Sequence, residues 1–275
     1  GMQFVILRLC DGTYVDKAFK SHLADAEAQG LLVSTYWYLR APSEGTTIAQ
    51  QVDVIDQQLG GRKDLGVWID VESVGADGKK LLTKDDVWAA KRELEKRGYH
   101  VAGIYSGAWY WENMPGGEPS MDGLGYLWVS NYGRNRKGTP RDTYTADGGD
   151  NHRGWTYPLG DRRPDILQFG SEGTVADWHP VDVNAYRGTR AELARIFHPN
   201  NKEADMTTND TKLLASDAAR DAADNRMQLR GPGDNGWEQL GKNQNGQNLT
   251  LVDAVAAIRH DLAALSRKID QMGDK

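Results

Sequence analysis

The stretch Val67-Trp-Ile-Asp-Val-Glu72 alternates strictly between aliphatic residues and larger or charged ones. Because successive side chains of a β-strand point to opposite faces, the three aliphatic residues are expected on one face. Trp68, Asp70 and Glu72 are then expected on the other. The pattern predicts a strand over 66–72 that carries two carboxylates near its C-terminal end.

The segments on either side of this strand alternate in the same way between strand and helix patterns. Apolar residues at helical spacing separate the first four strand-like segments, which is typical of parallel strands joined by right-handed crossovers. We therefore predict an α/β fold, a TIM-like (β/α) barrel with seven of the eight strands that a closed barrel needs. The expected strands are 4–9, 31–39, 66–72, 101–106, 126–132, 165–170 and 181–186.

The composition changes after residue 198, which is the expected end of the barrel domain, 1–198. Residues 199–248 are polar and rich in Gly and Asn, and they are interpreted as a linker with a short helix over 213–227. Residues 249–273 then carry apolar side chains at alternating spacings of four and three. This heptad pattern predicts an amphipathic helix, either a coiled coil that makes a homo-oligomer or a helix packed on its own domain. Its apolar positions are Leu251, Val255, Ile258, Leu262, Leu265, Ile269 and Met272.

Bulk properties exclude several classes of protein. The net charge of −6 over 275 residues argues against a general nucleic-acid binder. No apolar run approaches the ~20 residues that span a bilayer, and no signal-peptide pattern opens the sequence, so cytoplasmic synthesis without membrane attachment is expected. The single cysteine, Cys10, excludes an intramolecular disulfide and is interpreted as a small buried hydrophobe rather than a catalytic thiol.

Common cofactor signatures are missing from the sequence. The six histidines show neither an HxxxH spacing nor a pairing with cysteine that would indicate a metal site. No glycine-rich phosphate loop follows a predicted strand, and no serine lies in a GxSxG elbow. We therefore predict acid/base chemistry without a metal or another cofactor.

The two carboxylates of strand 66–72 are the candidate catalytic groups. In parallel barrels the active site lies at the C-terminal ends of the strands, where Asp70 and Glu72 are expected. Residues two apart on a strand are ~6.6 Å apart along it, between the two carboxyl separations used in glycoside hydrolysis. The alternative is that they cap the following loop or pair with Arg8. Asp182 is either a third acid of the site or a buried acid satisfied by backbone donors.

Further polar side chains are expected at neighbouring strand ends, where they are predicted to bind substrate. Taken singly, each could be structural, and only their shared placement favours a binding role. The nine Trp and eleven Tyr also suit stacking on sugar rings, although such residues pack ordinary cores as well. The predicted substrate-binding residues are Tyr36, Tyr105, Asn131, Tyr132 and Gln168.

Seven segments, in order, resemble motifs of glycoside hydrolase family 25, the Chalaropsis-type lysozymes that are common in phage endolysins. The resemblance covers about residues 1–198. The segments are Phe4-Val-Ile-Leu-Arg-Leu9 with Asp11-Gly12, Leu31-Leu-Val-Ser-Thr-Tyr36, Trp68-Ile-Asp-Val-Glu72, Ile104-Tyr-Ser106, Leu127-Trp-Val-Ser-Asn-Tyr132, Leu167-Gln-Phe169 and Val181-Asp-Val-Asn184.

The resemblance implies a distorted eight-stranded barrel that cleaves the β-1,4 bond after N-acetylmuramic acid in peptidoglycan. It assigns Glu72 as the general acid, Asp70 as the group that stabilises developing positive charge, and Asp182 to the same acidic cluster. It also implies a phage enzyme, made in the host cytoplasm, that acts on the bacterial cell wall. Two pocket residues depart from the family pattern, Trp37 in place of a histidine and Leu167 in place of an aromatic residue.

A third departure supports a different hypothesis. The family's first strand carries an Asp-x-Ser motif whose Asp belongs to the catalytic cluster, and this sequence is expected to start after that strand. The sheet is then expected to expose an edge. The alternative function is a non-catalytic barrel that binds glycan in a phage tail or another wall-associated assembly.

Overall fold

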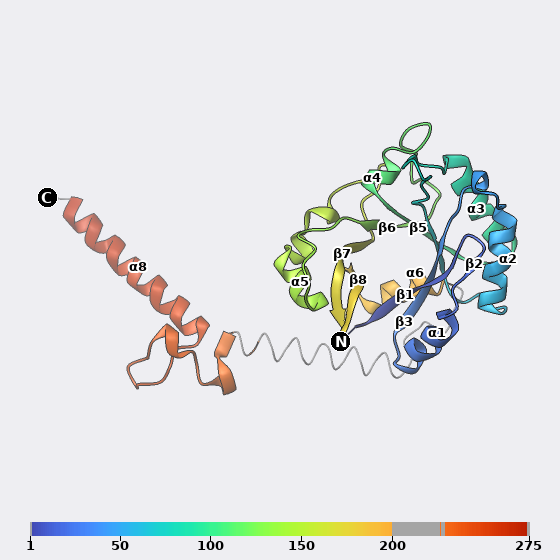
Figure 1. Ribbon diagram of the computed structural model, residues 1–275. Helices are drawn as coiled ribbons and strands as arrows, with labels where there is room; N and C mark the ends of the chain where they lie inside the picture. Colours follow the sequence, from blue (N-terminus) through green and yellow to red (C-terminus); the bar gives the residue numbers. More distant parts are fainter. Residues whose placement is uncertain (1, 200–225, 227–228, 274–275) are drawn as a thin grey trace. The chain divides into compact units, whose positions relative to one another are not determined.

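The computed structural model describes residues 2–199, 226 and 229–273. The chain divides into two units, Gly1–Asp205 and Met206–Lys275. The first unit is built on one eight-stranded sheet with helices around it (Figure 1). The described residues of the second contain one long helix, which follows a short irregular segment.

The strands of the first unit follow the order β2-β1-β3-β4-β5-β6-β7-β8 in the sheet. All seven strands expected from the sequence are present, with boundaries that differ by a few residues. The eighth, β2, is a two-residue strand that the sequence did not indicate. The strands are β1 (Phe4–Asp11), β2 (Tyr14–Val15), β3 (Leu32–Tyr38), β4 (Val67–Asp70), β5 (Val101–Gly107), β6 (Tyr126–Ser130), β7 (Ile166–Val175) and β8 (Trp178–Tyr186).

The strands β1 and β3 to β7 pair in parallel, as predicted. The prediction is wrong for β8, which pairs antiparallel to β7. Only Ala176 and Asp177 separate the two strands. A connection of two residues can form a hairpin but not a crossover, which needs a dozen or more. The sequence did not indicate this hairpin, because β7 and β8 both continue several residues beyond their apolar segments, towards the turn.

The sheet curls into a half-barrel that stays open. β2 pairs only with Cys10 and Asp11 of β1, so the outer edge of residues 4–9 has no strand partner within the described ranges. β8, at the other end of the order, pairs with β7 alone. Figure 1 shows the curl bringing β1 and β8 towards each other. The edge that the sequence predicted to be exposed is therefore a property of the fold.

Helices follow most of the parallel strands. Four of them are preceded by a threonine whose side chain accepts a hydrogen bond from the N–H of the third helical residue, at Thr47, Thr83, Thr139 and Thr189. Such caps satisfy backbone donors that the first turn leaves unpaired. The helices are α1 (Phe19–Ala28), α2 (Ile48–Leu59), α3 (Lys84–Lys96), α4 (Ala108–Trp111), α5 (Pro140–Ala146) and α6 (Arg190–Phe197), with single turns of 3₁₀ helix at Pro42–Glu44, Gly149–Asn151 and Arg153–Trp155.

The two faces of β4 pack as the alternation predicted. Val67, Ile69 and Val71 are fully buried in the core between the sheet and its helices. Trp68 belongs to a second cluster inside the curl, where it packs with Tyr105, Trp128 and other residues. The face that carries Asp70 therefore points into the half-barrel.

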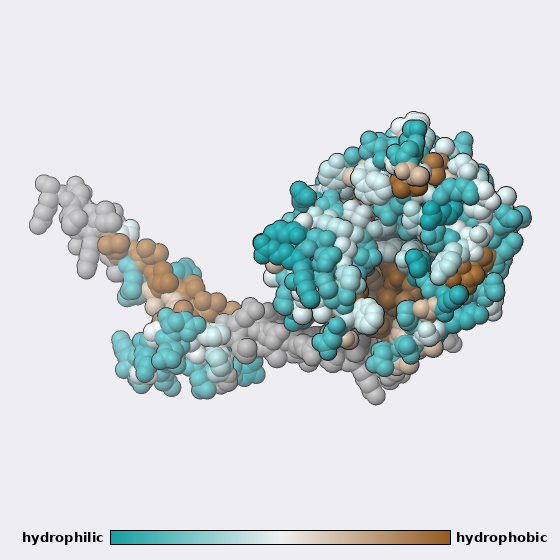
Figure 2. All heavy atoms as spheres, in the orientation of Figure 1, coloured by the Kyte–Doolittle hydropathy of each residue, from teal (hydrophilic) through white to brown (hydrophobic). Residues whose placement is uncertain are grey.

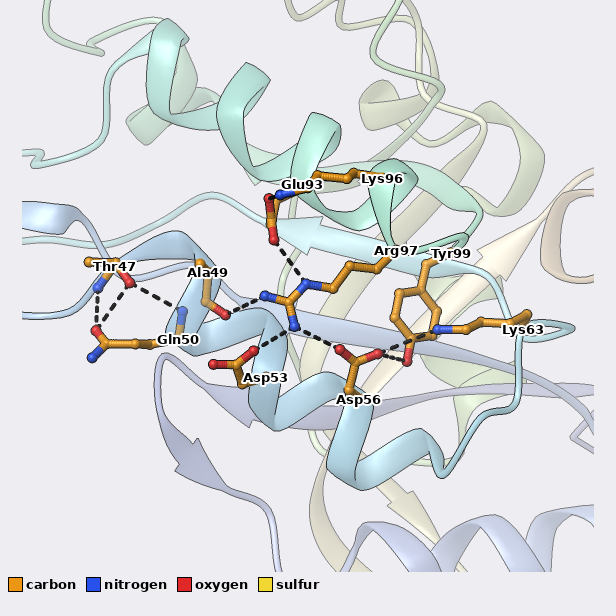
Figure 3. Close-up of polar contacts among 10 residues, drawn as sticks. All are labelled: Thr47, Ala49, Gln50, Asp53, Asp56, Lys63, Glu93, Lys96, Arg97 and Tyr99. Carbon is orange, nitrogen blue, oxygen red and sulfur yellow. Dashed lines mark hydrogen bonds and ion pairs between the residues drawn. The ribbon is translucent and has the colours of Figure 1, made fainter.

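Arg97, just after α3, links α3 to α2 through hydrogen bonds and ion pairs (Figure 3). Its guanidinium donates to Asp53 and Asp56 of α2, at 2.5 and 2.7 Å. It also donates to Glu93 at 2.9 Å and to the backbone carbonyl of Ala49 at 3.0 Å. Arg97, which is partly buried, thus donates to acceptors on both helices that cover this side of the sheet.

In the second unit, two 3₁₀ turns at Pro232–Asp234 and Glu238–Leu240 precede α8 (Leu251–Gly273). The amphipathic helix expected over 249–273 is thus present, whereas the predicted short helix over 213–227 lies almost wholly outside the described residues. The apolar positions of α8 that the structure describes are 41% to 60% exposed, and Figure 2 shows them as a stripe along the helix. Within the described part of the chain, no helix is long and apolar enough to span a bilayer.

Candidate active site

A cavity of about 650 Å³ runs through the inside of the curl, from the C-terminal ends of β3 to β5 along the gap between β1 and β8. Figure 2 shows this face of the unit hollowed, with hydrophobic residues in the hollow. Acidic, aromatic and aliphatic side chains share the lining. They are Met2, Phe4, Val5, Ile6, Leu31, Tyr36, Tyr38, Asp70, Glu72, Tyr105, Trp128, Gln168, Val175, Trp178, Pro180, Val181, Asp182 and Asn184.

The strand register places the polar lining residues in rows across the sheet. Tyr38, Asp70 and Tyr105 are paired neighbours on β3, β4 and β5. Gln168 of β7 and Asn184 of β8 form a second pair across the hairpin. Paired residues on neighbouring strands point to the same face, so the register itself gathers these side chains in the cavity.

Asp70, the last residue of β4, lies at the bottom of the site and is 5% exposed. Its Oδ1 atom is buried without a hydrogen-bond partner among the described residues. Burial, reinforced by the nearby charge of Glu72, raises the pKa of Asp70 well above its usual value. A buried carboxyl with an empty acceptor position is costly for the fold and is typical of a functional group.

Glu72 lies two residues further on, past the end of β4, so the strand predicted over 66–72 is shorter than expected. It nevertheless lines the same cavity as Asp70. Burial raises the pKa of Glu72 to about 7, and the charge of Asp182 adds to the increase. A hydrogen bond from Trp109 acts in the opposite direction, because it stabilises the ionised carboxylate.

Asp182, on β8, is the third acid of the cavity. Its pKa is raised by burial. The proposed alternative of a pair between Arg8 and the β4 carboxylates is not what the structure shows, since Arg8 donates to Asp16 at 2.9 Å. Three acids with raised pKa values therefore share one cavity, and like charges that close together favour retention of a proton.

The predicted substrate-binding residues separate into three positions. Tyr36, Tyr105 and Gln168 line the cavity. Tyr132 lies behind them, where its hydroxyl donates to Gln168 Oε1 at 2.8 Å, beside the Tyr105 hydroxyl at 2.7 Å. Asn131 is outside the lining, and its backbone N–H donates to the carbonyl of Gln168. The two phenols fix the Gln168 amide with its nitrogen as the remaining donor.

Sequence reasoning missed several residues of this site, including Trp128, Trp178, Tyr38 and Trp109. Tyr38 lines the cavity and is two residues after Tyr36 on β3, so the period-two rule could have found it. Trp109 reaches Glu72 from α4, a four-residue helix after β5 that no sequence pattern indicated. Among the described residues, no group of three or more His, Cys, Asp or Glu side chains is arranged to hold a metal ion.

A pair of protonatable carboxyl groups at the strand ends of a curled α/β sheet is an arrangement that glycoside hydrolases use. A family model described as "Glycosyl hydrolases family 25" matches residues 1–165, more than half of the sequence. The chain belongs to this family.

Solved structures of the same fold support the architecture. The bacterial lysozyme from Streptomyces coelicolor is 20% identical, with a TM-score of 0.54 over 72% of this chain and 87% of that one. A glycosyl hydrolase 25 of Streptococcus pneumoniae is 21% identical, with a TM-score of 0.53 over 71% and 82%. A family GH25 lysozyme from Aspergillus fumigatus is 20% identical, with a TM-score of 0.53 over 72% and 88%.

The C-terminal part matches a different family model, "Rv3766 C-terminal domain", over residues 206–266. A protein of Mycobacterium tuberculosis with the printed name "Uncharacterized protein Rv3766" is 60% identical over 38 residues. That match covers 14% of this chain and 14% of the mycobacterial protein. The two units of the chain therefore resemble different families.

Proposed function

We propose that this chain is a peptidoglycan muramidase that cleaves the β-1,4 bond between N-acetylmuramic acid and N-acetylglucosamine. The observation that carries the proposal is the coupled pair, Asp70 and Glu72, whose raised pKa values leave a proton available at neutral pH inside a substrate-sized cavity. Membership of family 25 supports the substrate class.

In the proposed mechanism, Glu72 protonates the glycosidic oxygen as the bond breaks. A carboxyl with a pKa about 7 is well matched to this task, because it is both protonated and able to lose its proton near neutrality. Asp70 stabilises the positive charge that develops on the sugar. Its unpartnered Oδ1 is positioned to accept a hydrogen bond from an acetamido N–H of the substrate. Asp182, on β8, adds a third acidic group whose negative charge contributes to the electrostatic field in the cavity.

The direct test is release of reducing sugar from purified cell walls. Wild type is expected to release it, and Glu72→Gln is expected to lose at least a hundredfold in rate, since general acid catalysis typically contributes 10²–10⁴. Glu95→Gln, on the exposed side of α3, is the matched control and should keep wild-type activity. Equal release by wild type and Glu72→Gln would remove Glu72 from the mechanism.

The second candidate is a glycan-binding barrel without catalysis, in a phage tail or another wall-associated assembly. The open edge of β1 favours it, because an open half-barrel can hold a ligand in its cavity without catalysing a reaction. Co-sedimentation with insoluble walls separates the two functions. Binding without any release of reducing sugar by wild type would support this candidate.

We further propose an endolysin-type role, in which the protein degrades the cell wall of a phage host. Its support is the family alone. Expression in the host together with a membrane-permeabilising protein should cause lysis, whereas Glu72→Gln expressed in the same way should not.

We also propose that the protein self-associates through α8. The support is the exposure of its apolar stripe, from Leu251 to Leu265, along one face of the helix. A row of exposed aliphatic residues at heptad spacing is stabilised when a second helix covers it.

A further inference from the structure

The hairpin of β7 and β8 extends well past the rest of the sheet. β6 pairs with β7 only from Ile166 to Gln168, whereas the pairing of β7 with β8 continues to Val175 and Trp178. The remainder of the hairpin, beyond Gln168, is an arm that forms one wall of the cavity. Its β7 strand also contacts Gly138 through an isolated bridge to Gly173 and a hydrogen bond from the Thr174 N–H. A strand advances ~3.3 Å per residue, so this arm reaches roughly 20 Å beyond Gln168.

The tip of the arm is built with backbone strain. Ala176 and Asp177 make the two-residue turn, with φ values of 47° and 64°. This left-handed conformation suits Gly or Asn, and in Ala it costs about 1–2 kcal/mol. Positive φ at both central residues is what a two-residue hairpin turn of type I′ requires, and Trp178 follows this turn directly.

Trp178 is the most exposed of the large hydrophobic side chains that the structure describes, at 75%. It also lines the same cavity as Asp70 and Glu72. Of the other aromatic residues in the lining, Tyr105 and Trp128 are 7% and 4% exposed, and Phe4, Tyr36 and Tyr38 are half-buried. Trp178 therefore offers an indole face to a ligand that extends outward from the carboxylates.

We propose that Trp178 is a stacking platform for a sugar ring remote from the cleaved bond, and that the arm selects long glycan strands over short ones. The inference rests on the proposed function for the identity of the polymer. Sugar rings have apolar faces of C–H groups, and an aromatic ring with a large accessible face packs against them. Val175, Pro180 and Val181 extend the apolar wall around Trp178.

A platform of this kind has a kinetic signature that a structural role lacks. A contact made equally in the ground state and the transition state changes KM and leaves kcat unchanged. Trp178→Ala is therefore expected to raise KM on long strands by about tenfold, which equals a loss of about 1.4 kcal/mol in binding. On the shortest substrates, wild type and Trp178→Ala should have the same KM.

The test uses β-1,4-linked N-acetylglucosamine oligomers as the probe, a disaccharide and a hexasaccharide, with the full chain carrying Glu72→Gln so that nothing is cleaved. Calorimetry should show that Trp178→Ala weakens hexasaccharide binding about tenfold and leaves disaccharide binding unchanged. Trp178→Phe should recover most of the affinity. Tyr14→Ala, which removes an aromatic side chain that is 59% exposed and outside the cavity, is the matched control.

The outcomes separate the inference from the proposed function. Unchanged hexasaccharide binding in Trp178→Ala would overturn the inference, whether or not wild type cleaves walls. Weakened binding together with a wild type that releases no reducing sugar would support the platform and refute the muramidase. Absence of any binding by the parent chain would overturn the platform, and wall cleavage by wild type would then show that the muramidase function survives without it.

Discussion

At the scale of residues, the proposed chemistry depends on the protonation states of two carboxyl groups, those of Asp70 and Glu72. Asp70 is deeply buried, whereas Glu72 lies past the strand end and receives a hydrogen bond from Trp109. The deeper group has no compensating partner within the described residues, which makes it the harder of the two to ionise. A ligand that donates a hydrogen bond to Asp70 would lower the pKa of Asp70 and favour its ionised form, which the proposed mechanism needs.

The pH dependence of activity follows from Glu72. A general acid acts in its protonated form, so kcat/KM should fall about tenfold per pH unit above about pH 7. Trp109→Phe removes a donor that stabilises the carboxylate, so the pKa of Glu72 should rise and the alkaline limb should move to higher pH. Rate profiles on cell walls would measure this shift. Tyr126→Phe is the control, and an unmoved limb in Trp109→Phe would contradict the hydrogen bond.

The same pKa makes a prediction about stability. The folded pKa of Glu72, about 7, lies above the unfolded value of 4.5, so its contribution to stability is complete below about pH 4.5 and is lost as the pH rises through 7. Glu72→Gln should therefore raise the free energy of unfolding at pH 8 by about 1–3 kcal/mol, with no gain at pH 4. Thermal melts at the two pH values check this. A variant less stable than wild type at pH 8 would contradict it.

The sequence predicted the position of the site more accurately than its full set of residues. Asp70 and Glu72 could be placed on one face by alternation alone, and the register of neighbouring strands then brought Tyr36, Tyr105 and Gln168 near them. Asn131 lies outside the cavity lining, and β6 ends one residue before it, at Ser130. Trp109 could not be predicted, since its role depends on how a four-residue helix folds back over the strand ends.

At the scale of elements, the packing of α3 on α2 depends strongly on Arg97. It is 21% exposed and holds three carboxylates and a carbonyl (Figure 3). Arg97→Met leaves those carboxylates facing one another, and because Asp53 and Asp56 are partly exposed we expect a loss of about 1–2 kcal/mol of stability. Lys96→Met, whose side chain is 75% exposed, is the control and should change stability by less than about 0.5 kcal/mol. Chemical denaturation measures both, and equal effects would show that Arg97 is only a surface charge.

Elements were predictable where apolar periodicity was unambiguous. The strands β3 and β5 and the helices α2 and α3 have clear patterns and lie close to where the sequence placed them. The arm of β7 and β8 was not predictable, because Gly170, Gly173 and polar residues interrupt it. Its pairing contains three register shifts, so no alternation survives along its length. Backbone hydrogen bonds between β7 and β8, rather than a side-chain pattern, hold that segment together.

At the scale of the whole molecule, the exposed stripe of α8 sets the expected oligomeric state. The double variant Ile258→Glu and Leu262→Glu should convert an oligomer to a monomer, because charges at seam positions destabilise helix pairing. Ala256→Glu with Ala263→Glu, on another face of the same helix, is the matched control. Light scattering of the full chain measures mass directly, and a wild-type monomer at high concentration would contradict the proposed self-association.

The open sheet has a consequence for how the backbone exchanges hydrogen with solvent. Along β1, alternate amides point to β3 or away from it, and residues 4–9 have no strand beyond them in the described ranges. Deuterium uptake should therefore alternate residue by residue along this stretch, slow towards β3 and fast outward. Nuclear magnetic resonance can record the two rates separately. Uniform protection would mean that another polypeptide segment pairs with the outer edge of β1 in solution.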